Sequence, residues 1–349
     1  MDKELLDLYS DFLLSSTGER TATKLSAALG GFISHDKVTR FLSAEEYDSK
    51  ALWREVKPCI RQMEQSKGGV LVFDDTIEAK PHTDENKIVA WHFDHCSGRN
   101  VKGINILSCM IVHEESAIPV AFEIVKKDVE FSDIKTRKLC RVARISKNEY
   151  MRDMVKVCIH NDVKFEYVMA DTWFSSSETM AFIRKKGKKF IFPVKSNRLM
   201  ALTRHAKKFV CVNDMELEPN VTKVVYLKGL DLPVALTKKV FTNKDGSCGI
   251  LYLVCNDTTL DGGQIYEIYK KRWKIEEYHK SLKSNLGLEA SPTKVQRTQS
   301  NHVFAAIYAY FKLEMLSIKQ SMNHFALKSK LLVSATRAAF DLLQNIKIA

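Results

Sequence analysis

The stretch GGVLVFDDT, residues 68–76, decides the fold of this 349-residue chain. Four apolar residues, Val70 to Phe73, form a short continuous run that ends in Asp74 and Asp75. A run of this length, bounded by glycines and by acidic residues, is typical of a strand buried on both faces of a sheet. We therefore expect a buried strand that emerges at a polar edge of the sheet and carries carboxylates at its end.

The segments that follow residue 76 predict an α/β domain. After a polar loop, the expected order of strand, strand, helix, strand, helix and strand falls at residues 102–115, 117–127, about 133–160, 165–174, 176–187 and 188–196. The last helix has serines at its start, which can cap it, and Gly187 at its end. Hairpin strands thus precede a parallel portion of the sheet.

The second half of the chain has two further patterns. Short strands and turns between residues 196 and 258 indicate a mostly antiparallel β-rich insertion. From residue 259 the pattern is helical to the end. The predicted division is a helical region at 1–67, the core at 68–195, the insertion at 196–258, the rest of the core at 259–290 and a helical C-terminal segment at 291–349.

Carboxylates follow two of the predicted strands. Asp75 ends the first strand and Asp171 ends the strand at 165–174. In open α/β sheets this edge collects ligands and metals, and phosphoryl transfer uses hard cations held by Asp and Glu. Asp74 is an alternative to Asp75, because adjacent strand residues point to opposite faces. A turn or capping role is the more common use of any single strand-end aspartate.

A basic helix is expected from Gln264 to about Leu286. At ~100° per residue, one stripe of it contains Tyr269, Arg272, Glu276, Lys280 and Lys283. Apolar residues at 268, 275, 282 and 286 form a second stripe. A carboxylate flanked by cations fits a site that holds metal and phosphate side by side. A solvated helix held by pairs such as Arg272–Glu276 remains the alternative.

The first 67 residues are expected to contain two short amphipathic segments around Gly30 and Gly31. This pattern matches a helix-turn-helix whose second segment, about Ser34 to Phe41, would offer Lys37 and Arg40 to DNA. A plain helical hairpin remains the alternative.

The overall composition favours a nucleic-acid partner. The formal net charge is +12, which suits a polyanion, although a solvated basic surface has the same charge. No apolar run reaches the ~18 residues of a membrane span, and the acidic N-terminus is unlike a signal peptide. The eight cysteines are scattered without a C-x-x-C pair, which argues against a zinc site. We expect a cytoplasmic protein with no membrane partner.

The stripe on the basic helix resembles a known family. Tyr269-x2-Arg272-x3-Glu276-x6-Lys283 matches the Y-x(2)-R-x(3)-E-x(6)-K signature of bacterial insertion-sequence transposases of the DDE class. The segments DDT at Asp74 and ADTWF at Asp171 resemble the first and second aspartate motifs of that subgroup. The resemblance extends in order from about Gly68 to Glu289.

This resemblance implies an RNase H-like core interrupted by a β-rich insertion. It implies a catalytic and metal-binding triad of Asp75, Asp171 and Glu276, with Asp75 chosen because it directly precedes Thr76. Two Mg²⁺ ions, for which Mn²⁺ can substitute, would serve the cleavage of transposon ends. The freed 3′-OH would then join target DNA in a cut-and-paste reaction. A homodimer in the synaptic complex and association with the bacterial nucleoid are implied as well.

DNA-binding residues follow from the resemblance and from charge. Tyr269, Arg272 and Lys283 would hold phosphates near the cleaved end, with Lys280 assisting. Relatives can stack a flipped base on a tryptophan of the insertion, but no tryptophan lies there in this sequence; Tyr252 or Trp273 are the candidates. Lys195 and Arg198 follow the last core strand and are further candidates, against an ordinary surface role.

Two other functions remain open from the sequence. An RNase H-like nuclease without strand transfer needs the same carboxylates. A catalytically silent repressor derived from a transposase needs only the DNA-binding surface, although all three acids are present.

Overall fold

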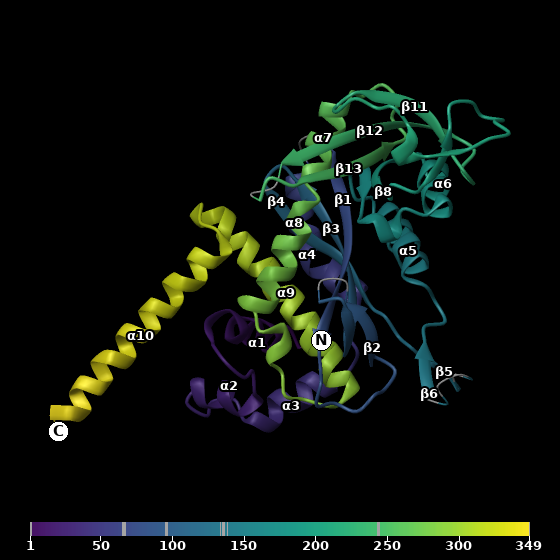
Figure 1. The fold of residues 1–349 in the computed structure, drawn as a ribbon. Coiled ribbons are helices and arrows are strands. Elements are labelled where there is room, and N and C mark those ends of the chain that lie inside the picture. Colours follow the sequence, from purple (N-terminus) through teal and green to yellow (C-terminus); the bar gives the residue numbers. More distant parts are fainter. Residues whose placement is uncertain are drawn as a thin grey trace.

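The computed structural model describes residues 2–64, 68–94, 97–132, 134, 137, 139–242 and 245–348. One mixed sheet runs through the molecule (Figure 1). Its spatial strand order is β10-β9-β11-β12-β13-β8-β7-β1-β3-β2, and β4 pairs with β3. The strands of the core are β1 (Gly69–Ala79), β2 (Val89–Asp94), β3 (Arg99–His113), β4 (Ser116–Ile124), β7 (Phe165–Met169) and β8 (Lys189–Val194).

The centre of the sheet has the predicted mixture of strand directions. Strand β1 is antiparallel to β3 and parallel to β7, and β7 is parallel to β8. Strand β1 is fully buried from Gly69 to Phe73 and only partly buried at Asp74 and Asp75. The mixed α/β class is thereby confirmed, and the order β4-β3-β1-β7-β8 is consistent with an RNase H-like core.

Helices cover the two faces of this core. Helix α5 (Lys147–His160) packs on the face that carries Cys109, whose sulfur lies 4.0 Å from that of Cys158. Helix α8 (Trp273–Ser284) packs on the opposite face, where the Tyr278 hydroxyl lies 3.2 Å from that of Ser108. Helix α6 (Ser177–Lys185) contacts β8, and α9 (Gln296–Gln320) contacts β4.

The second half of the sheet lies at 196–258, where short strands were predicted. It contains β9 (Leu199–Ala201), β10 (Val210–Cys211), β11 (Thr222–Leu227), β12 (Pro233–Thr242) and β13 (Cys248–Cys255). These strands pair with one another in antiparallel fashion. Strand β13 also pairs with β8, so these strands extend the core sheet instead of forming a sheet of their own.

The basic helix differs from the single helix that the sequence predicted. It consists of α7 (Gly262–Lys270) and α8, separated at Lys271 and Arg272. Across this junction the amides of 271, 272, 274 and 275 donate to the carbonyls three residues earlier, as in a 3₁₀-helix. Tighter winding rotates α7 relative to α8, so a stripe drawn at ~100° per residue does not run unbroken through both.

Two other predictions of local structure were wrong. Strand β2 lies within the segment that the sequence predicted as a polar loop. The helix expected from about residue 133 begins only at Lys147, and a small hairpin of β5 (Val129–Ser132) and β6 (Leu139–Val142) precedes it. Asp133 itself lies outside the described residues. Ser146 caps α5 and forms a capping box with Glu149, which explains the start of that helix.

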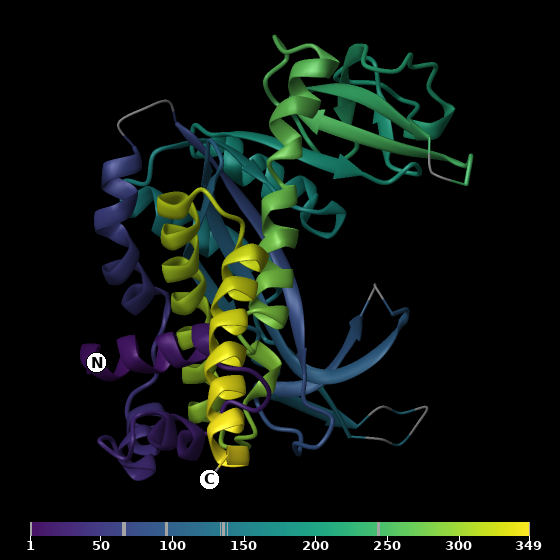
Figure 2. The ribbon, with the colours of Figure 1, turned by 90° about the vertical axis from the view of Figure 1, so that its left-hand side faces the viewer.

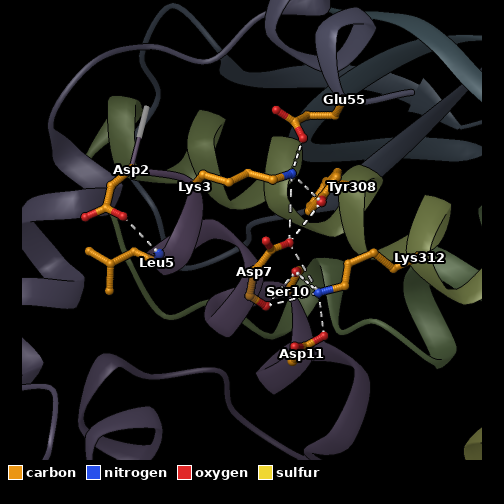
Figure 3. Close-up of polar contacts among 9 residues, drawn as sticks. All are labelled: Asp2, Lys3, Leu5, Asp7, Ser10, Asp11, Glu55, Tyr308 and Lys312. Carbon is orange, nitrogen blue, oxygen red and sulfur yellow. Dashed lines mark hydrogen bonds and ion pairs between the residues drawn. The ribbon is translucent and has the colours of Figure 1, made fainter. Parts of the chain in front are cut away.

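The described part of the N-terminal region is made of four helices, of which the first, third and fourth contact α9 and the second packs on the third. They are α1 (Lys3–Ser15), α2 (Ala22–Ala28), α3 (His35–Ser43) and α4 (Ser49–Met63). Between α1 and α9, Figure 3 shows a group of polar contacts that we call the α1–α9 clamp: Lys3, Asp7, Ser10, Asp11, Glu55, Tyr308 and Lys312. The Tyr308 hydroxyl donates to Asp7 at 2.9 Å, and Lys312 pairs with Asp11 at 2.5 Å.

The C-terminal helix α10 (His324–Ile348) extends away from the body as a rod (Figure 1). Short 3₁₀ turns complete the chain at Thr172–Phe174, Val212–Asp214 and Leu288–Ala290. Among the described helices, none combines the length and the apolar character that crossing a membrane requires.

Candidate active site

Two aspartates lie side by side where β1 and β7 end. Val72 of β1 is paired with Met169 of β7. Two residues further along each strand, Asp74 and Asp171 therefore lie next to each other on one face of the sheet. Asp74 is paired with Ser108 of β3, whose hydroxyl contacts Tyr278, so this is the face that α8 covers.

Helix α8 brings a third carboxylate to this face. Glu276 lies in its first turn, and the Arg272 guanidinium just before it contacts Glu276 at 3.2 Å. The same guanidinium reaches Asp74 at 3.5 Å. Arg272 thus bridges the first strand and the helix, and we call the group of Asp74, Asp171, Glu276 and Arg272 the carboxylate cluster.

Crowding of like charges changes the acidity of the cluster. Burial, together with the neighbouring charges of Asp171 and Glu276, raises the pKa of Asp74 to about 7, although Arg272 acts to lower it. Burial and the charge of Asp75 raise the pKa of Asp171, against the amide donors of Trp173 and Phe174. One arginine does not balance three carboxylates, which is the electrostatic condition of a site built for an additional cation.

His279 completes a set of ligand atoms that the sequence reasoning missed. One ligand atom each of Asp74, Glu276 and His279 lies within 4.8 Å of the others, close enough to hold one metal ion. The His279 Nε2 atom is buried and has no hydrogen-bond partner among the described residues. Burial lowers the pKa of His279 to about 3, so the ring is neutral and its free nitrogen can act as a ligand.

These observations support the fit of a divalent cation to the cluster. Carboxylate oxygens suit Mg²⁺ and Mn²⁺, and a neutral imidazole suits several transition metals. The sequence does contain a signal for His279, because Glu276-x-x-His279 places both side chains on one helix face.

Asp75 is placed differently from the sequence expectation. It points to the α5 face, where Lys147 contacts one carboxylate oxygen at 2.7 Å and the Asn105 side-chain amide donates to the other at 2.6 Å. Both oxygens of Asp75 are thus engaged by the protein. The structure therefore groups Asp74, and not Asp75, with Glu276, because strand alternation sends the two aspartates to opposite faces.

The other residues of the basic helix lie around the cluster. Tyr269 is buried, with its ring 5.8 Å from the Arg272 guanidinium, and the ring shields that cation from water. Lys283 donates to the Ile77 carbonyl at 2.9 Å and is only partly exposed. Trp273 is 64% exposed.

Trp273 and Lys280 both line a groove between α8, α9 and α10. This groove has a volume of about 740 Å³ and includes Glu276 in its wall. The Lys280 ammonium lies over the ring of Phe325 at 5.0 Å. The residues of the predicted stripe thus have different environments: Tyr269 is buried, Arg272 bridges Asp74 and Glu276, and Lys280 lines the groove.

Lys195 and Arg198 lie beside the cluster rather than in it. They line a pocket with Lys228 and Trp173, close to the turn that carries Asp171. Arg198 donates to the Ser177 hydroxyl at 2.5 Å, and burial lowers its pKa. Both cations are therefore near the ends of β7 and β8, as their sequence position suggested.

The predicted helix pair near the N-terminus is present as α2 and α3. Leu25, Val38 and Leu42 are buried between and beneath them. Lys37 and Arg40 are on the exposed surface of α3. The DNA-binding role of this pair stays a prediction.

The sequence matches two protein-family descriptions. Residues 135–312 match "Transposase DDE domain", and residues 1–207 match "DDE superfamily endonuclease". Each match covers more than half of the chain. The protein belongs to the DDE transposase family, whose members act on nucleic acid. These matches identify the family and do not distinguish the bacterial subgroup that the motif resembles.

A solved structure entitled "Drosophila P element transposase strand transfer complex" also matches part of the chain. The two share 13% sequence identity, with a TM-score of 0.24, over 53% of this chain and 36% of that chain. The match thus spans about a third of that chain. No curated protein matches the sequence.

Proposed function

We propose that this protein is a cut-and-paste transposase that cleaves the inverted-repeat ends of its insertion sequence and joins them to target DNA. The observation that carries the proposal is the carboxylate cluster, in which three acids from β1, the end of β7 and α8 converge around one arginine. Such an arrangement is stable in the metal-free protein only at an electrostatic cost, which a bound divalent cation relieves.

The catalytic triad in this proposal is Asp74, Asp171 and Glu276, with Asp74 in place of Asp75. Asp74 and Glu276, together with His279, would hold one ion, and Asp171 would share a second with Asp74. Bound Mg²⁺ would polarise the scissile phosphate and activate water or the 3′-OH. Arg272 would hold a phosphate oxygen beside the cluster, since its planar group suits that geometry.

The remaining DNA contacts extend outward from the cluster. Trp273 and Lys280 would contact DNA along the groove of α8, while Lys195 and Arg198 would contact it near Asp171. Tyr269 and Lys283 would support Arg272 and the end of β1. On α3, Lys37 and Arg40 would bind the transposon end at a distance, and a homodimer would bring two ends together.

The test uses a supercoiled plasmid that carries the coding region with its natural flanking DNA. Asp74→Asn and Glu276→Gln should each lower Mg²⁺-dependent cleavage at least about a thousandfold, because each removes a ligand of the reacting centre. DNA binding, measured without metal, should persist. Asp75→Asn is the matched control and should lower cleavage less than about tenfold, since Lys147 and Asn105 hold both carboxylate oxygens of Asp75 and only its charge acts on Asp171 and His279.

Normal cleavage by Asp74→Asn would overturn the assignment of that residue. A profile in which Asp75→Asn is inactive and Asp74→Asn is active would restore Asp75. Plasmid products joined at the 3′ ends support the transposase, whereas nicks without joined products support a nuclease without strand transfer.

A further inference from the structure

The segment that joins β4 to α5 is unusually basic. Residues 126–147 contain eight Lys or Arg and three Asp or Glu, a net charge of +5 within a chain of +12. Within it, β5 and β6 form a separate two-stranded sheet that does not pair with the main sheet. We call this hairpin with its following residue Arg144 the β5–β6 arm.

The arm has one apolar face that no other part of the described chain covers fully. Register pairs Val129 with Val142 and Phe131 with Cys140, and these four side chains share a face. Phe131 and Val142 are each 42% exposed. A two-stranded hairpin of this size is marginally stable alone, so its apolar face indicates a surface that acquires a partner.

The charges of the arm indicate the kind of partner. On the other face, Arg141 pairs with Glu130. Arg144 has 73% of its side chain exposed, and its contact with Asp128 is long, at 3.5 Å. An excess of cations around exposed apolar side chains is complementary to DNA and unfavourable for contact with a second equally basic copy.

We propose that the β5–β6 arm enters the minor groove of the DNA held at the carboxylate cluster. Minor-groove proteins combine Arg or Lys at the groove walls with apolar side chains placed against the bases. Arg144, which is 73% exposed, supplies one cation, and Arg141, which is 19% exposed and paired with Glu130, supplies a second when that pair opens; Phe131 with Val142 supplies the apolar wedge. This inference rests on the proposed function, because it assumes DNA at the cluster.

Both ends of the arm are fixed to the body. On one side, Lys147 contacts Asp75, the neighbour of Asp74, at 2.7 Å. On the other side, the Lys127 ammonium donates to the Trp91 carbonyl of β2 at 2.6 Å. The base of the arm therefore lies beside Asp75, one residue along β1 from the cluster.

The position of the arm in the molecule suits a second contact point on one duplex. In Figures 1 and 2 the arm lies at the opposite end of the core from β11–β13, and α8 lies between them in height. Figure 2 also shows the β2–β3 hairpin projecting on the same side as the arm.

The first test measures how DNA affinity depends on salt, without divalent metal. The variant Arg141→Ala/Arg144→Ala should reduce the slope of log K against log salt by about two units, because about 0.9 unit is lost per phosphate contact. The matched control is Lys319→Ala/Lys330→Ala, on α9 and α10, which should leave the slope unchanged. An unchanged slope in the arm variant would overturn the proposal.

The second test concerns the apolar face and uses hydroxyl-radical footprinting, which reports protection of the minor groove. Phe131→Thr/Val142→Thr should lose protection at one minor-groove position while keeping protection near the cleavage site. Threonine retains the preference for a strand, so the arm should stay folded. Leu316→Thr, at an exposed apolar position of α9, is the control.

The outcomes separate this proposal from the function on which it rests. If the wild-type protein binds DNA and the arm variants keep the full footprint and slope, the arm proposal fails alone. If the wild-type protein binds no DNA, the proposed function fails as well. If Phe131→Thr/Val142→Thr converts a dimer to a monomer in sedimentation and keeps the footprint, the apolar face contacts a second copy, and the arm proposal fails.

Discussion

The carboxylate cluster and the α1–α9 clamp both bring charged side chains together, but their charges are balanced differently. In the clamp, Lys3 pairs with Glu55 and Lys312 pairs with Asp11, while Asp7 accepts from Tyr308. In the cluster, three carboxylates face one arginine. Two lysines bind the three carboxylates of the clamp and join helices, whereas one arginine faces three carboxylates at the edge of the sheet, where a ligand would supply a further cation.

This difference explains why the two regions respond differently to their surroundings. The clamp is largely satisfied by its own side chains and lies partly in water. The cluster is more buried, so its repulsion is less screened and appears as a raised pKa of Asp74. Changes of pH and of divalent cations should therefore act mainly on the cluster, and changes of sequence mainly on the clamp.

The largest expected effect is on the stability of the metal-free protein as a function of pH. The pKa of Asp74 is about 7 in the folded protein, against 3.8 for an unperturbed aspartate, which we take for the unfolded chain. Between these two values the folded state holds a proton that the unfolded chain has released. The free energy of unfolding should therefore fall as the pH rises from about 4 to about 7, by at most on the order of 4 kcal/mol from this group. Urea unfolding in EDTA at several pH values measures it.

Asp74→Asn isolates this contribution from other buried acids. Burial also raises the pKa of Glu78 and Glu123 to about 7, so the wild-type curve contains their titration too. The difference between wild type and variant should show the variant more stable at pH 8 and the two nearly equal at pH 4. Equal stability at both pH values would show that the cluster is not electrostatically strained.

The next effect is stabilisation by a divalent cation. Mg²⁺ at a hundred times its dissociation constant should add about 2.7 kcal/mol, because it binds only the folded state. Glu276→Gln should lose most of this gain, and Asp75→Asn should keep it, since Asp75 is engaged by Lys147 and Asn105. Thermal unfolding with and without Mg²⁺ measures the gain. A Mg²⁺ effect that is lost in Asp75→Asn would move the site to the α5 face.

The sequence predicted much of the fold because its signals were local. The apolar run before Asp74 and the run before Asp171 each indicated a buried strand, and both are central strands of the sheet. The β-strands between residues 196 and 258 were visible from turn residues and short apolar runs. The β5–β6 hairpin was missed because its spacing resembled a helix and its pairing is not visible in one strand alone.

The site was harder to predict because it depends on which face of the sheet, and which side of the basic helix, each side chain occupies. The alternation of side chains along a strand predicts that only one of Asp74 and Asp75 enters the site. It does not identify which one, because that depends on which face of the sheet α8 covers, and this is set by the whole fold. The 3₁₀ turn at Arg272 likewise changes the direction in which the side chains of α7 point relative to those of α8. No residue type at this turn predicts it from the sequence. The spacing of three residues between Glu276 and His279 can be read from the sequence. The buried Nε2 atom without a hydrogen-bond partner, which indicates a ligand role, is known only from the structure.

A smaller effect is expected in the clamp. Asp7→Ala removes the acceptor of the Tyr308 hydroxyl and a partner of Lys312, and should destabilise the protein by about 1 kcal/mol. The Mg²⁺ gain and the pH difference attributed to Asp74 should not change. Asp11→Ala is the control, because its side chain is 60% exposed and should matter less. A changed Mg²⁺ gain in Asp7→Ala would show that the two regions are coupled.

The smallest effect is expected at an ion pair that lacks burial altogether. Arg204 donates two hydrogen bonds of 2.7 Å to Asp231, and the two side chains are 53% and 74% exposed. Its geometry is better than that of either region compared above, yet water and salt screen it. Arg204→Ala, Asp231→Ala and the double variant should therefore all unfold at the wild-type midpoint. A clear coupling in this cycle, especially one that persists at high salt, would mean that bond geometry and not burial sets the strength of charge pairs here. The contrast between cluster and clamp would then need an explanation other than exposure to water.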